Sequence, residues 1–473
     1  MSPLSVSLVA SASNPNGSIP VKDESYIRDS FFKSVQWSAD GTTLFTSSFS
    51  NRICTFVLPE TLLEPRQSPI ELTANSTLAL PEPTSAIAPC PYFALENPST
   101  QVLLTASTDH PIQLHHAFSP SSSPTSSSIS NKDGDDNNQT TPPLSPQPTG
   151  RPPPLASFRL IKHETEAYLP IASLLWPAPG THFIVGSTNR IALFDVSRSD
   201  ALSPDPLLSI PTIPSTRHLA KGGGVGMRGT VSALAAQPVL PSAGADGGGW
   251  GLLAAGTWTR NLGIYDLIRS GSCVATWSAA SVAEDAGVGG RGVMQTLWSP
   301  CGRYLVVNER GATGLLVYDL RGTHRLLGTL EGRNGTTNQR LSCDVFPGNE
   351  GTGGFEVWAG TKNGGVVAWE GIGNHEGAIE PSWDWKAHGS AVGATAMHTS
   401  GSVLATCSGA WTFVDDDSSD SSEESGSETS TTCRNSGKPR VVIKETSLKL
   451  WSLVSSGSSH SETGSIEGDR IET

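Results

Sequence analysis

Short runs of apolar residues separated by turn residues recur along the chain, and each set closes on an aromatic residue followed by a polar one. The clearest copies end in Leu193-Phe194-Asp195, Ile264-Tyr265-Asp266, Val317-Tyr318-Asp319, Ala368-Trp369-Glu370 and Leu450-Trp451-Ser452. A repeat of roughly 40 residues or more that is built of strands indicates one four-stranded blade of a β-propeller. Seven such repeats predict an all-β, seven-bladed propeller.

The strands of each blade can be placed from these runs. In the first repeat, residues 34–37, 44–47 and 53–56 are predicted strands, and Asp40-Gly41 between the first two is a strong hairpin signal. The second repeat is weaker, with strands expected at 92–94, 102–105 and 112–115. Outer fourth strands are expected between blades, for example at 273–277 and 325–329.

The last blade lacks a fourth strand of its own, because only a polar tail follows residue 454. Residues 4–10 form a spare apolar strand at the other end of the chain. We expect this N-terminal strand to complete the last blade, which would close the ring and remove an exposed sheet edge. The propeller would then span residues 1–454.

Three segments have compositions that do not fit the ring. They are a Ser/Pro-rich insertion at 119–154, an acidic Ser-rich insertion at 411–440, and a polar tail at 455–473. Segments with so few apolar residues cannot offset the entropy lost on ordering. All three are predicted to be disordered.

The formal net charge of −13 argues against general electrostatic adhesion to nucleic acid or to anionic membranes. Much of the acid lies in 415–428, however, so a local basic face remains compatible with this charge. The seven cysteines are scattered and never spaced as CxxC, which predicts neither disulfides nor a zinc site. No stretch approaches the roughly 20 apolar residues of a membrane span. These features are typical of a soluble intracellular protein without a metal or cofactor.

Basic residues recur in the loops between the second and third strands of the blades. In a propeller these loops lie on the same face as the loops that join blades. The candidates in this set are Arg52, Arg190, Arg260, Arg310 and Lys362, while the second blade has Asp109-His110 instead. Arg340 follows an interblade loop and is expected on this face too. Converging arginines suit phosphate, because a guanidinium can pair two oxygens at once.

Four further residues near these loops could stack on or hydrogen-bond to exposed bases, namely Trp258, Asn189, Asn338 and Gln339. Two alternatives remain open. Loop arginines often join neighbouring blades by pairing with carboxylates, and a basic face could equally bind an acidic peptide. An enzyme is disfavoured, since no GxSxG or GxxxxGK[ST] motif occurs, and His115, His116 and His388 have no ligand-spaced companions.

With the blades placed, the chain resembles the telomerase Cajal body protein 1 family of WD40 propellers. The sharpest element is the string Thr336-Thr337-Asn338-Gln339-Arg340, which is unusual among propellers. Supporting matches are Asp29-Ser30-Phe31-Phe32-Lys33 ahead of Trp37, Asn189-Arg190, Arg260 with Leu262-Gly263, and Asp319-Leu320-Arg321. The fold expected from this resemblance is a WD40-type propeller.

The resemblance implies a noncatalytic scaffold in the nucleus. Members of the family, and similar fungal splicing-associated proteins, act on small Cajal body RNAs, telomerase RNA or small nuclear ribonucleoproteins. The expected partners are therefore small nuclear or small Cajal body RNA and the proteins of those particles, with this chain a monomer in the larger assembly. A scaffold that binds only proteins and meets RNA indirectly is the alternative.

Overall fold

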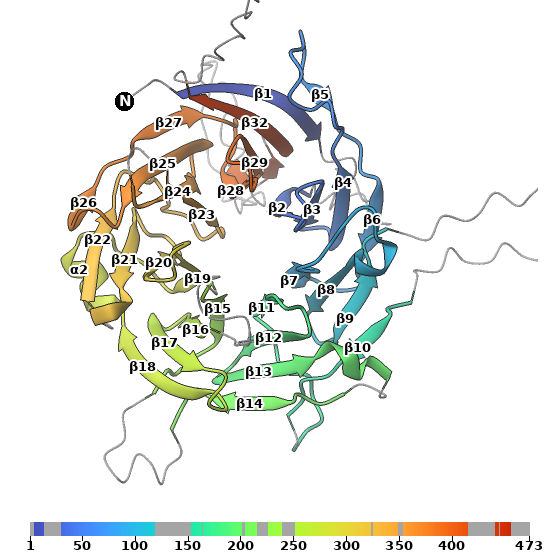
Figure 1. Ribbon diagram of the computed structural model, residues 1–473, viewed down its shortest axis with the longest axis vertical. Coiled ribbons are helices and arrows are strands. Elements are labelled where there is room, and N and C mark those ends of the chain that lie inside the picture. The colour runs from blue at the N-terminus through green and yellow to red at the C-terminus, as the bar shows by residue number, and fades with distance from the viewer. Residues whose placement is uncertain are drawn as a thin grey trace, which may run out of the picture.

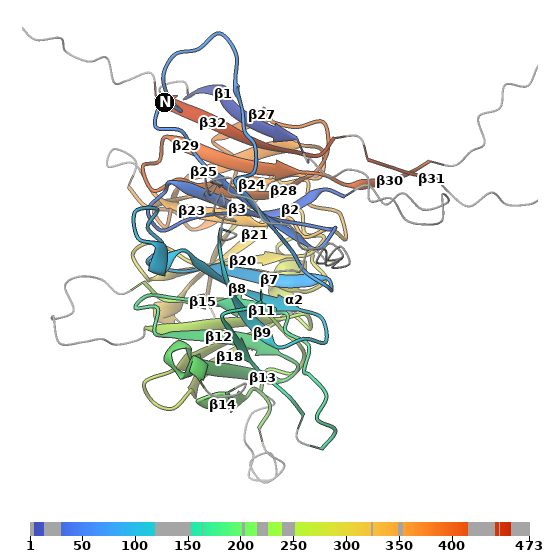
Figure 2. The same ribbon diagram turned by 90° about the vertical axis from the view of Figure 1, so that its right-hand side faces the viewer.

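The computed structural model describes residues 4–13, 30–118, 153–162, 164–200, 204–214, 226–238, 251–322, 325–348, 353–414, 440–443 and 445–455. Seven β-sheets are arranged around a central axis in chain order (Figure 1), and they form a flat ring when viewed from the side (Figure 2). The prediction of an all-β, seven-bladed propeller is confirmed.

Each blade has four antiparallel strands, and in blades 1 to 6 these strands follow one another outward from the axis in the order of the chain. Blades 1 and 2 consist of β2 (Phe32–Trp37), β3 (Thr43–Ser48), β4 (Arg52–Val57), β6 (Ser76–Ala79), and of β7 (Thr84–Pro89), β8 (Val102–Ser107), β9 (Ile112–His116), β10 (Ala156–Phe158). Blades 3 and 4 consist of β11 (Ser173–Leu175), β12 (His182–Ser187), β13 (Arg190–Asp195), β14 (Leu208–Pro211), and of β15 (Val231–Ala236), β16 (Leu252–Thr257), β17 (Asn261–Asp266), β18 (Ser272–Ser278).

The second half of the ring continues the pattern. Blade 5 consists of β19 (Val293–Trp298), β20 (Tyr304–Glu309), β21 (Leu315–Asp319) and β22 (Arg325–Leu330), and blade 6 of β23 (Cys343–Pro347), β24 (Phe355–Gly360), β25 (Gly365–Ile372) and β27 (Trp383–Lys386). The short β26 (Gly377–Ile379) leaves blade 6 and adds to β22 in parallel. The outer strands expected at 273–277 and 325–329 are therefore present as β18 and β22.

Blade 7 is assembled from both ends of the chain. Its inner strands are β28 (Val392–Met397), β29 (Val403–Ser408) and β32 (Ser447–Ser455), and its outer strand is β1 (Leu4–Ser13). β1 pairs with β32 in antiparallel register from Leu4↔Ser455 to Ser13↔Ser447, and Figure 1 shows the two strands side by side. The prediction that the N-terminal strand closes the ring is confirmed. β5 (Ile70–Glu71) adds a parallel pairing on the outside of β1.

The structure corrects the position predicted for the first strand of blade 2. That strand is β7, and residues 92–94 lie instead in the loop between β7 and β8. The apolar run at 92–94 is misleading because Phe93 is only 1% exposed and fills the core from within this loop. Its ring packs edge-on against Phe45 of blade 1 at 5.4 Å between centroids.

The disorder predicted for 411–440 is wrong at its two ends, where β30 (Trp411–Val414) pairs with β31 (Arg440–Ile443) as a hairpin. Figure 2 shows this hairpin projecting from one face of the ring. Aromatic and β-branched residues at both ends favour this pairing. The remainder of that segment, residues 119–152 and residues 456–473 lie outside the described residues, so the other predictions of disorder remain predictions.

Helical structure is confined to connections between strands. The described residues contain one short α-helix, α2 (Ala280–Asp285), and the 3₁₀ turns η1 (Pro98–Thr100), η2 (Val196–Asp200) and η3 (Leu320–Gly322). No helix in the described ranges is long and apolar enough to cross a membrane. Within the same ranges, no three His, Cys, Asp or Glu side chains are grouped closely enough to hold a metal ion.

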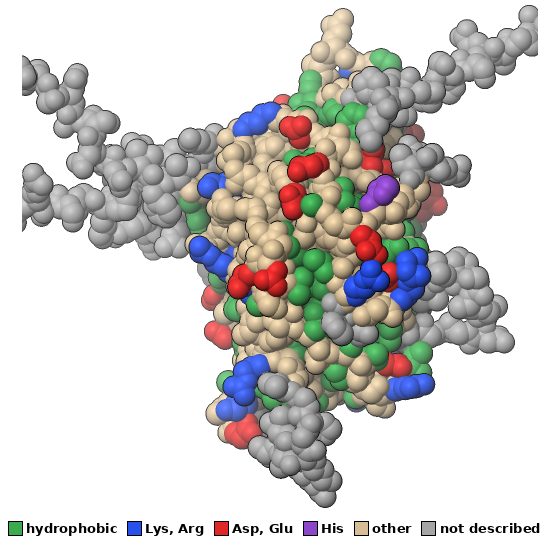
Figure 3. All heavy atoms as spheres, turned by 90° about the vertical axis from the view of Figure 1, so that its left-hand side faces the viewer, with side chains coloured by type: hydrophobic (Ala, Val, Ile, Leu, Met, Phe, Trp, Pro, Cys, Tyr) green, Lys and Arg blue, Asp and Glu red, His purple; other side chains and the backbone are tan. Residues whose placement is uncertain are grey.

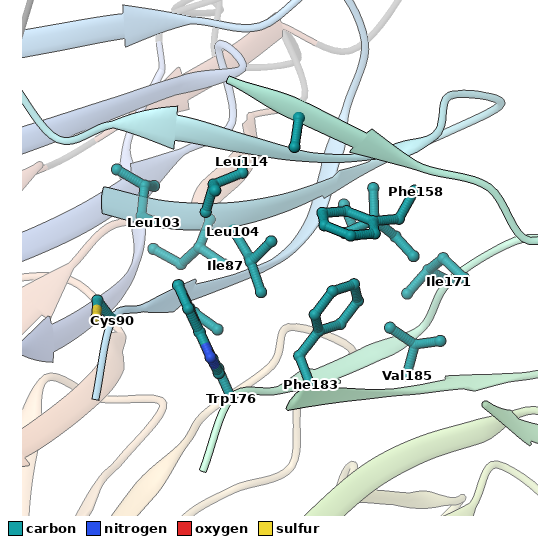
Figure 4. Close-up of a cluster of buried hydrophobic side chains, with 14 of the residues drawn as sticks. Ile87, Cys90, Leu103, Leu104, Leu114, Phe158, Ile171, Trp176, Phe183 and Val185 are labelled. Carbon is teal, nitrogen blue, oxygen red and sulfur yellow. The ribbon is translucent and has the colours of Figure 1, made fainter. Parts of the chain in front are cut away.

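The core lies between adjacent blades. Second strands such as β3 and β20 are buried along their whole length, because both of their faces contact neighbouring sheets. Figure 4 shows the packing between blades 2 and 3, where Phe158, Trp176 and Phe183 point toward one another. The rings of Phe158 and Phe183 meet edge-on with centroids 4.9 Å apart. Large aromatics bury much apolar area per residue, which explains why a chain with only 36% hydrophobic residues closes a ring.

A buried polar network joins three parts of blade 7. The imidazole of His388, only 2% exposed, lies within hydrogen-bonding distance of Thr406 in β29 and of Glu445 just before β32. The indole of Trp451 donates to the same Thr406 hydroxyl at 2.9 Å. Hydrogen bonds, first from His388 and also from Lys449, hold the pKa of Glu445 well below its usual value. His388 is therefore a structural histidine of the core.

Candidate nucleic-acid interface at the mouth of the central channel

The innermost strands of the seven blades surround a central channel. Residues of β2, β7, β11, β15, β19, β23 and β28 all line it, and its volume is about 700 Å³. Neither the hairpin loops nor the outer strands contribute to its walls along most of its length. Most side chains that reach this space belong to an innermost strand or to a loop that bends over the end of the channel, and Ser47 of β3 reaches it from a second strand.

The loops between second and third strands share one face of the ring with the loops that join blades, as predicted. Backbone hydrogen bonds connect the two kinds of loop in successive blades. They are Leu80 N to Asn51 O at 2.8 Å, Thr212 N to Asn189 O at 3.0 Å, Ala279 N to Arg260 O at 2.9 Å and Lys362 N to Asn334 O at 2.7 Å. All of the predicted basic residues therefore lie on one face, the face from which β30 and β31 project.

Three cations reach the channel at this face. Arg310 follows β20 directly, Arg340 precedes β23, and Lys33 is the second residue of β2. Arg340 donates from Nη2 to the backbone oxygen of Met294 at 2.9 Å, and the Lys33 ammonium donates to the backbone oxygen of Thr84. No carboxylate among the described residues forms an ion pair with any of the three.

The pKa values reflect this concentration of positive charge. Burial, and secondarily the charge of Arg340, lowers the pKa of Lys33 to about 8. Burial and the charge of Arg310 likewise lower the pKa of Arg340. The charge of Arg340 thus disfavours the protonated form of Lys33, and the charge of Arg310 that of Arg340, so a bound anion would relieve the repulsion among these groups.

Among the described residues that line the channel, one carries a carboxyl group, Asp344 in β23. Its oxygens accept hydrogen bonds from the backbone amides of Met397 at 2.7 Å and Val345 at 2.9 Å, so it joins blade 6 to blade 7 and pairs with none of the three cations. Burial raises the pKa of Asp344 to about 6. The channel therefore has a net positive charge within a chain whose overall charge is −13.

Other predicted basic residues lie on the same face but away from the channel. Arg52 and Arg190 are the first residues of the third strands β4 and β13, which lie two strands out from the axis. Lys362 is exposed in the turn before Gly364. None of the three lines the channel. Sequence alignment of the repeats placed these residues in the correct loops but could not give their distance from the axis.

Arg260 has a different role from the rest of the set. It occupies the left-handed turn position, with φ of 64°, that Asn51 and Asn189 occupy in their blades. Its guanidinium pairs with Glu309 at 2.9 Å and with Glu284 of α2 at 3.0 Å. Glu309 is only 3% exposed, and burial raises its pKa despite this partner. Arg260 therefore joins blades 4 and 5, which is the structural alternative considered above.

The predicted polar and aromatic residues divide in a similar way. Gln339 and Trp258 line the channel, and Trp258 is 55% exposed. The side-chain amide of Gln339 donates to the backbone oxygen of Gly409 at 2.7 Å, so the 336–340 loop reaches across to blade 7. Asn338 of the same loop is exposed but does not line the channel.

Two residues at the channel mouth, Lys33 and Phe49, were not among the candidates. Lys33 belongs to the family-like string before Trp37, but it directly precedes the strand predicted at 34–37, so it was not expected to line the channel. A lysine on an innermost strand is the signal that could have identified it, since those strands line the axis. Phe49 lies in the loop between β3 and β4, for which the sequence predicted Arg52 alone as a candidate.

The outer wall of the ring is electrostatically different from the channel mouth. Figure 3 shows the wall at α2 and β26, where acidic and basic side chains are interspersed. Arg325 of β22 pairs there with Glu376 at 2.7 Å, and Arg303 and Arg321 both pair with Asp319. Positive charge is thus compensated on this wall and uncompensated in the channel.

Comparison with known proteins gives a distant relative. The chain is 22% identical over 342 residues to guanine nucleotide-binding protein negative regulator 1 of Schizosaccharomyces pombe. The aligned region covers 72% of this chain and 70% of that protein. No family model matches the chain. Together with the seven sheets of the ring, this likeness supports a WD-repeat propeller that acts as a scaffold.

Proposed function

We propose that the protein is a noncatalytic WD-repeat scaffold that binds RNA at the mouth of its central channel. The observation that carries this proposal is the group formed by Lys33, Arg310 and Arg340, three cations without an ion pair among the described residues. Like charges that lie close together without a carboxylate partner repel one another, so such a set indicates a partner of opposite charge. The phosphates of RNA supply that charge, and guanidinium groups bind phosphate well.

The family resemblance adds support from an independent direction. Gln339 and Arg340 belong to the string that carries the likeness to the telomerase Cajal body protein 1 family, and both line the channel. We therefore propose small nuclear or small Cajal body RNA particles in the nucleus as the partners, with this chain as one monomer in the assembly. Pre-mRNA splicing or the biogenesis of small nuclear or telomerase RNA would be the process served.

Changing Arg340 to Ala should weaken RNA binding while leaving the fold intact. A hydrogen bond to a charged group contributes about 1.5–3 kcal/mol, which corresponds to a loss of roughly 10- to 150-fold in affinity. The slope of log affinity against log salt should also fall by about 0.7, the value for one phosphate contact to a single strand. Anisotropy of a labelled RNA pool, titrated at several salt concentrations, measures both quantities.

Arg190→Ala is the matched control, because Arg190 lies on the same face but outside the channel. It should leave both affinity and salt slope close to those of the unchanged protein. Equal losses in the two variants would mean that the whole face attracts RNA without a defined site. Unchanged binding by Arg340→Ala would contradict the proposed function at this site.

A protein-only scaffold is the second candidate, and the distant relative favours it. That relative is named as a negative regulator of a guanine nucleotide-binding protein. The same cations would then hold an acidic peptide, and RNA would associate indirectly. Binding of this kind would show a shallow salt slope, would survive nuclease treatment, and would be lost in Arg340→Ala without any direct crosslink to RNA.

A further inference from the structure

Three aromatic rings from distant parts of the chain meet beside the channel mouth. Phe31 precedes β2, Phe49 follows β3, and Trp411 begins β30. The ring centroids of Phe31 and Phe49 are 4.5 Å apart, those of Phe49 and Trp411 are 4.7 Å apart, and those of Phe31 and Trp411 are 5.3 Å apart. These three residues are called the aromatic ledge below.

The ledge has a buried base and an accessible surface. Phe31 is only 1% exposed, whereas Phe49 is 41% and Trp411 43% exposed. Two large rings that touch each other thus remain open to solvent, although packing against Phe31 holds them. The planes of these two rings are inclined by 58°, so each ring offers its own face to a ligand, and together they form one apolar surface rather than a single side chain exposed by chance.

Local contacts fix the ledge in place. The backbone amide of Phe49 donates to the oxygen of Phe31 at 3.1 Å. Phe31 packs directly on Gly409, where an added Cβ would lie 2.2 Å from the Cβ of Phe31. The oxygen of Gly409 accepts the hydrogen bond from Gln339 described above, which holds the start of the hairpin that carries Trp411. A preformed surface of this kind binds with little loss of conformational entropy.

The ledge adjoins the cations of the channel. The Lys33 ammonium lies 5.7 Å from the centroid of the Phe49 ring, and Lys33 is close enough to Arg340 for that charge to lower its pKa. Exposed aromatic ring faces and a pair of cations that can bind phosphate therefore lie side by side. This is the combination by which proteins bind unpaired nucleotides, whose bases stack on aromatic rings while basic groups follow the backbone.

We infer that the ledge stacks an unpaired base of RNA while Lys33 and Arg340 bind the adjacent phosphate. The ligand at this mouth is therefore single-stranded RNA. In a duplex the faces of the bases are covered by their neighbours, so a ring surface has nothing to stack on except at the end of the helix. This inference rests on the proposed function and specifies which form of RNA it involves.

The test replaces the rings by a side chain that fills space without a flat face. Phe49→Leu and Trp411→Leu should each weaken binding of a short single-stranded RNA pool by roughly 5- to 150-fold, the range for loss of one stacked base. Binding of a fully paired RNA duplex should be weak for the unchanged protein and insensitive to both substitutions. Tyr92→Leu is the control, since Tyr92 is 51% exposed on the opposite face, in the β7–β8 loop.

An RNA series with one abasic nucleotide at each position in turn gives a second readout. Removal of the base at one position should strongly weaken binding to the unchanged protein. The same removal should not weaken binding to Phe49→Leu, because both changes remove the same stacking contact. This coupling identifies stacking even if a leucine variant melts at a lower temperature, since a loss of folded protein would affect every RNA of the series equally.

The outcomes separate the inference from the proposed function. Salt-dependent binding that is unchanged by both leucine variants, or equal binding of paired and unpaired RNA, would overturn the ledge assignment and leave RNA binding in place. Absence of direct RNA binding by the unchanged protein would overturn both. Selective loss with single-stranded RNA, together with the coupled abasic position, would support both.

Discussion

We expect removal of residues 1–12 to abolish cooperative folding of the ring. β1 pairs with β32 along nearly its whole length, and it buries Ala10 and Ala12 to 0% and 1% exposure in the core. Each backbone hydrogen bond contributes about 0.5–1.5 kcal/mol, so the lost pairing amounts to the order of 5 kcal/mol or more. That is comparable with the whole stability of a typical domain, about 5–15 kcal/mol.

Two point variants on the same strand separate the loss of closure from the loss of chain length. Ala12→Asp places a charge in the core and should lower the melting temperature by many degrees, whereas Ser7→Asp lies on the exposed side of β1 and should change it little. Thermal unfolding followed by circular dichroism measures all three proteins. A truncated protein that melts like the full chain would contradict the role of β1 in closure.

Changing Arg333 to Met should destabilise the fold by about 3–5 kcal/mol. Arg333 is only 2% exposed, and its guanidinium donates to the Asn308 side chain at 2.8 Å and to the backbone oxygens of Gly360 at 3.0 Å and Leu341 at 2.7 Å. These acceptors belong to blades 5 and 6 and to the loop between them. Each buried acceptor left without a donor costs about 1–3 kcal/mol.

Arg325→Met provides the comparison for this variant. Arg325 and Glu376 form an ion pair at 2.7 Å, but both side chains are more than 60% exposed. An exposed pair of this kind contributes about 0–1 kcal/mol. Urea unfolding should therefore distinguish the two arginines clearly. Similar urea midpoints for the two variants would mean that water replaces the hydrogen bonds of Arg333 without loss of stability, and would contradict this prediction.

The sequence predicts this fold well because local pattern and global architecture agree. Each blade contributes its own short apolar strands and its own turn signals, such as Asp40-Gly41, so that strands can be placed one repeat at a time. The closure by residues 4–10 follows from counting strands. The prediction at 92–94 is wrong because Phe93 is an apolar residue buried from a loop, and a short apolar run does not distinguish that case from a strand.

The site was harder to predict than the fold. Comparison of repeats places Arg52, Arg190 and Arg340 on one face, which the structure bears out, but only radial position decides which of them reach the channel. The aromatic ledge depends on packing between residues 31, 49 and 411, and nothing local to any of them indicates the other two. Contacts between positions far apart in a chain come from the fold as a whole, so they appear only when the ring is assembled.

The central claim is that RNA binds at the channel mouth on the face that carries β30 and β31. Ultraviolet crosslinking of the purified protein in cell extract, followed by mass spectrometry of the peptides and sequencing of the attached RNA, tests it most directly. The account predicts crosslinks on peptides that contain Lys33, Phe49 and Arg340, to unpaired positions of small nuclear or small Cajal body RNAs. Crosslinks confined to the opposite face, in the loops at 38–42, 90–101 and 398–402, or the absence of any crosslinked RNA, would contradict it.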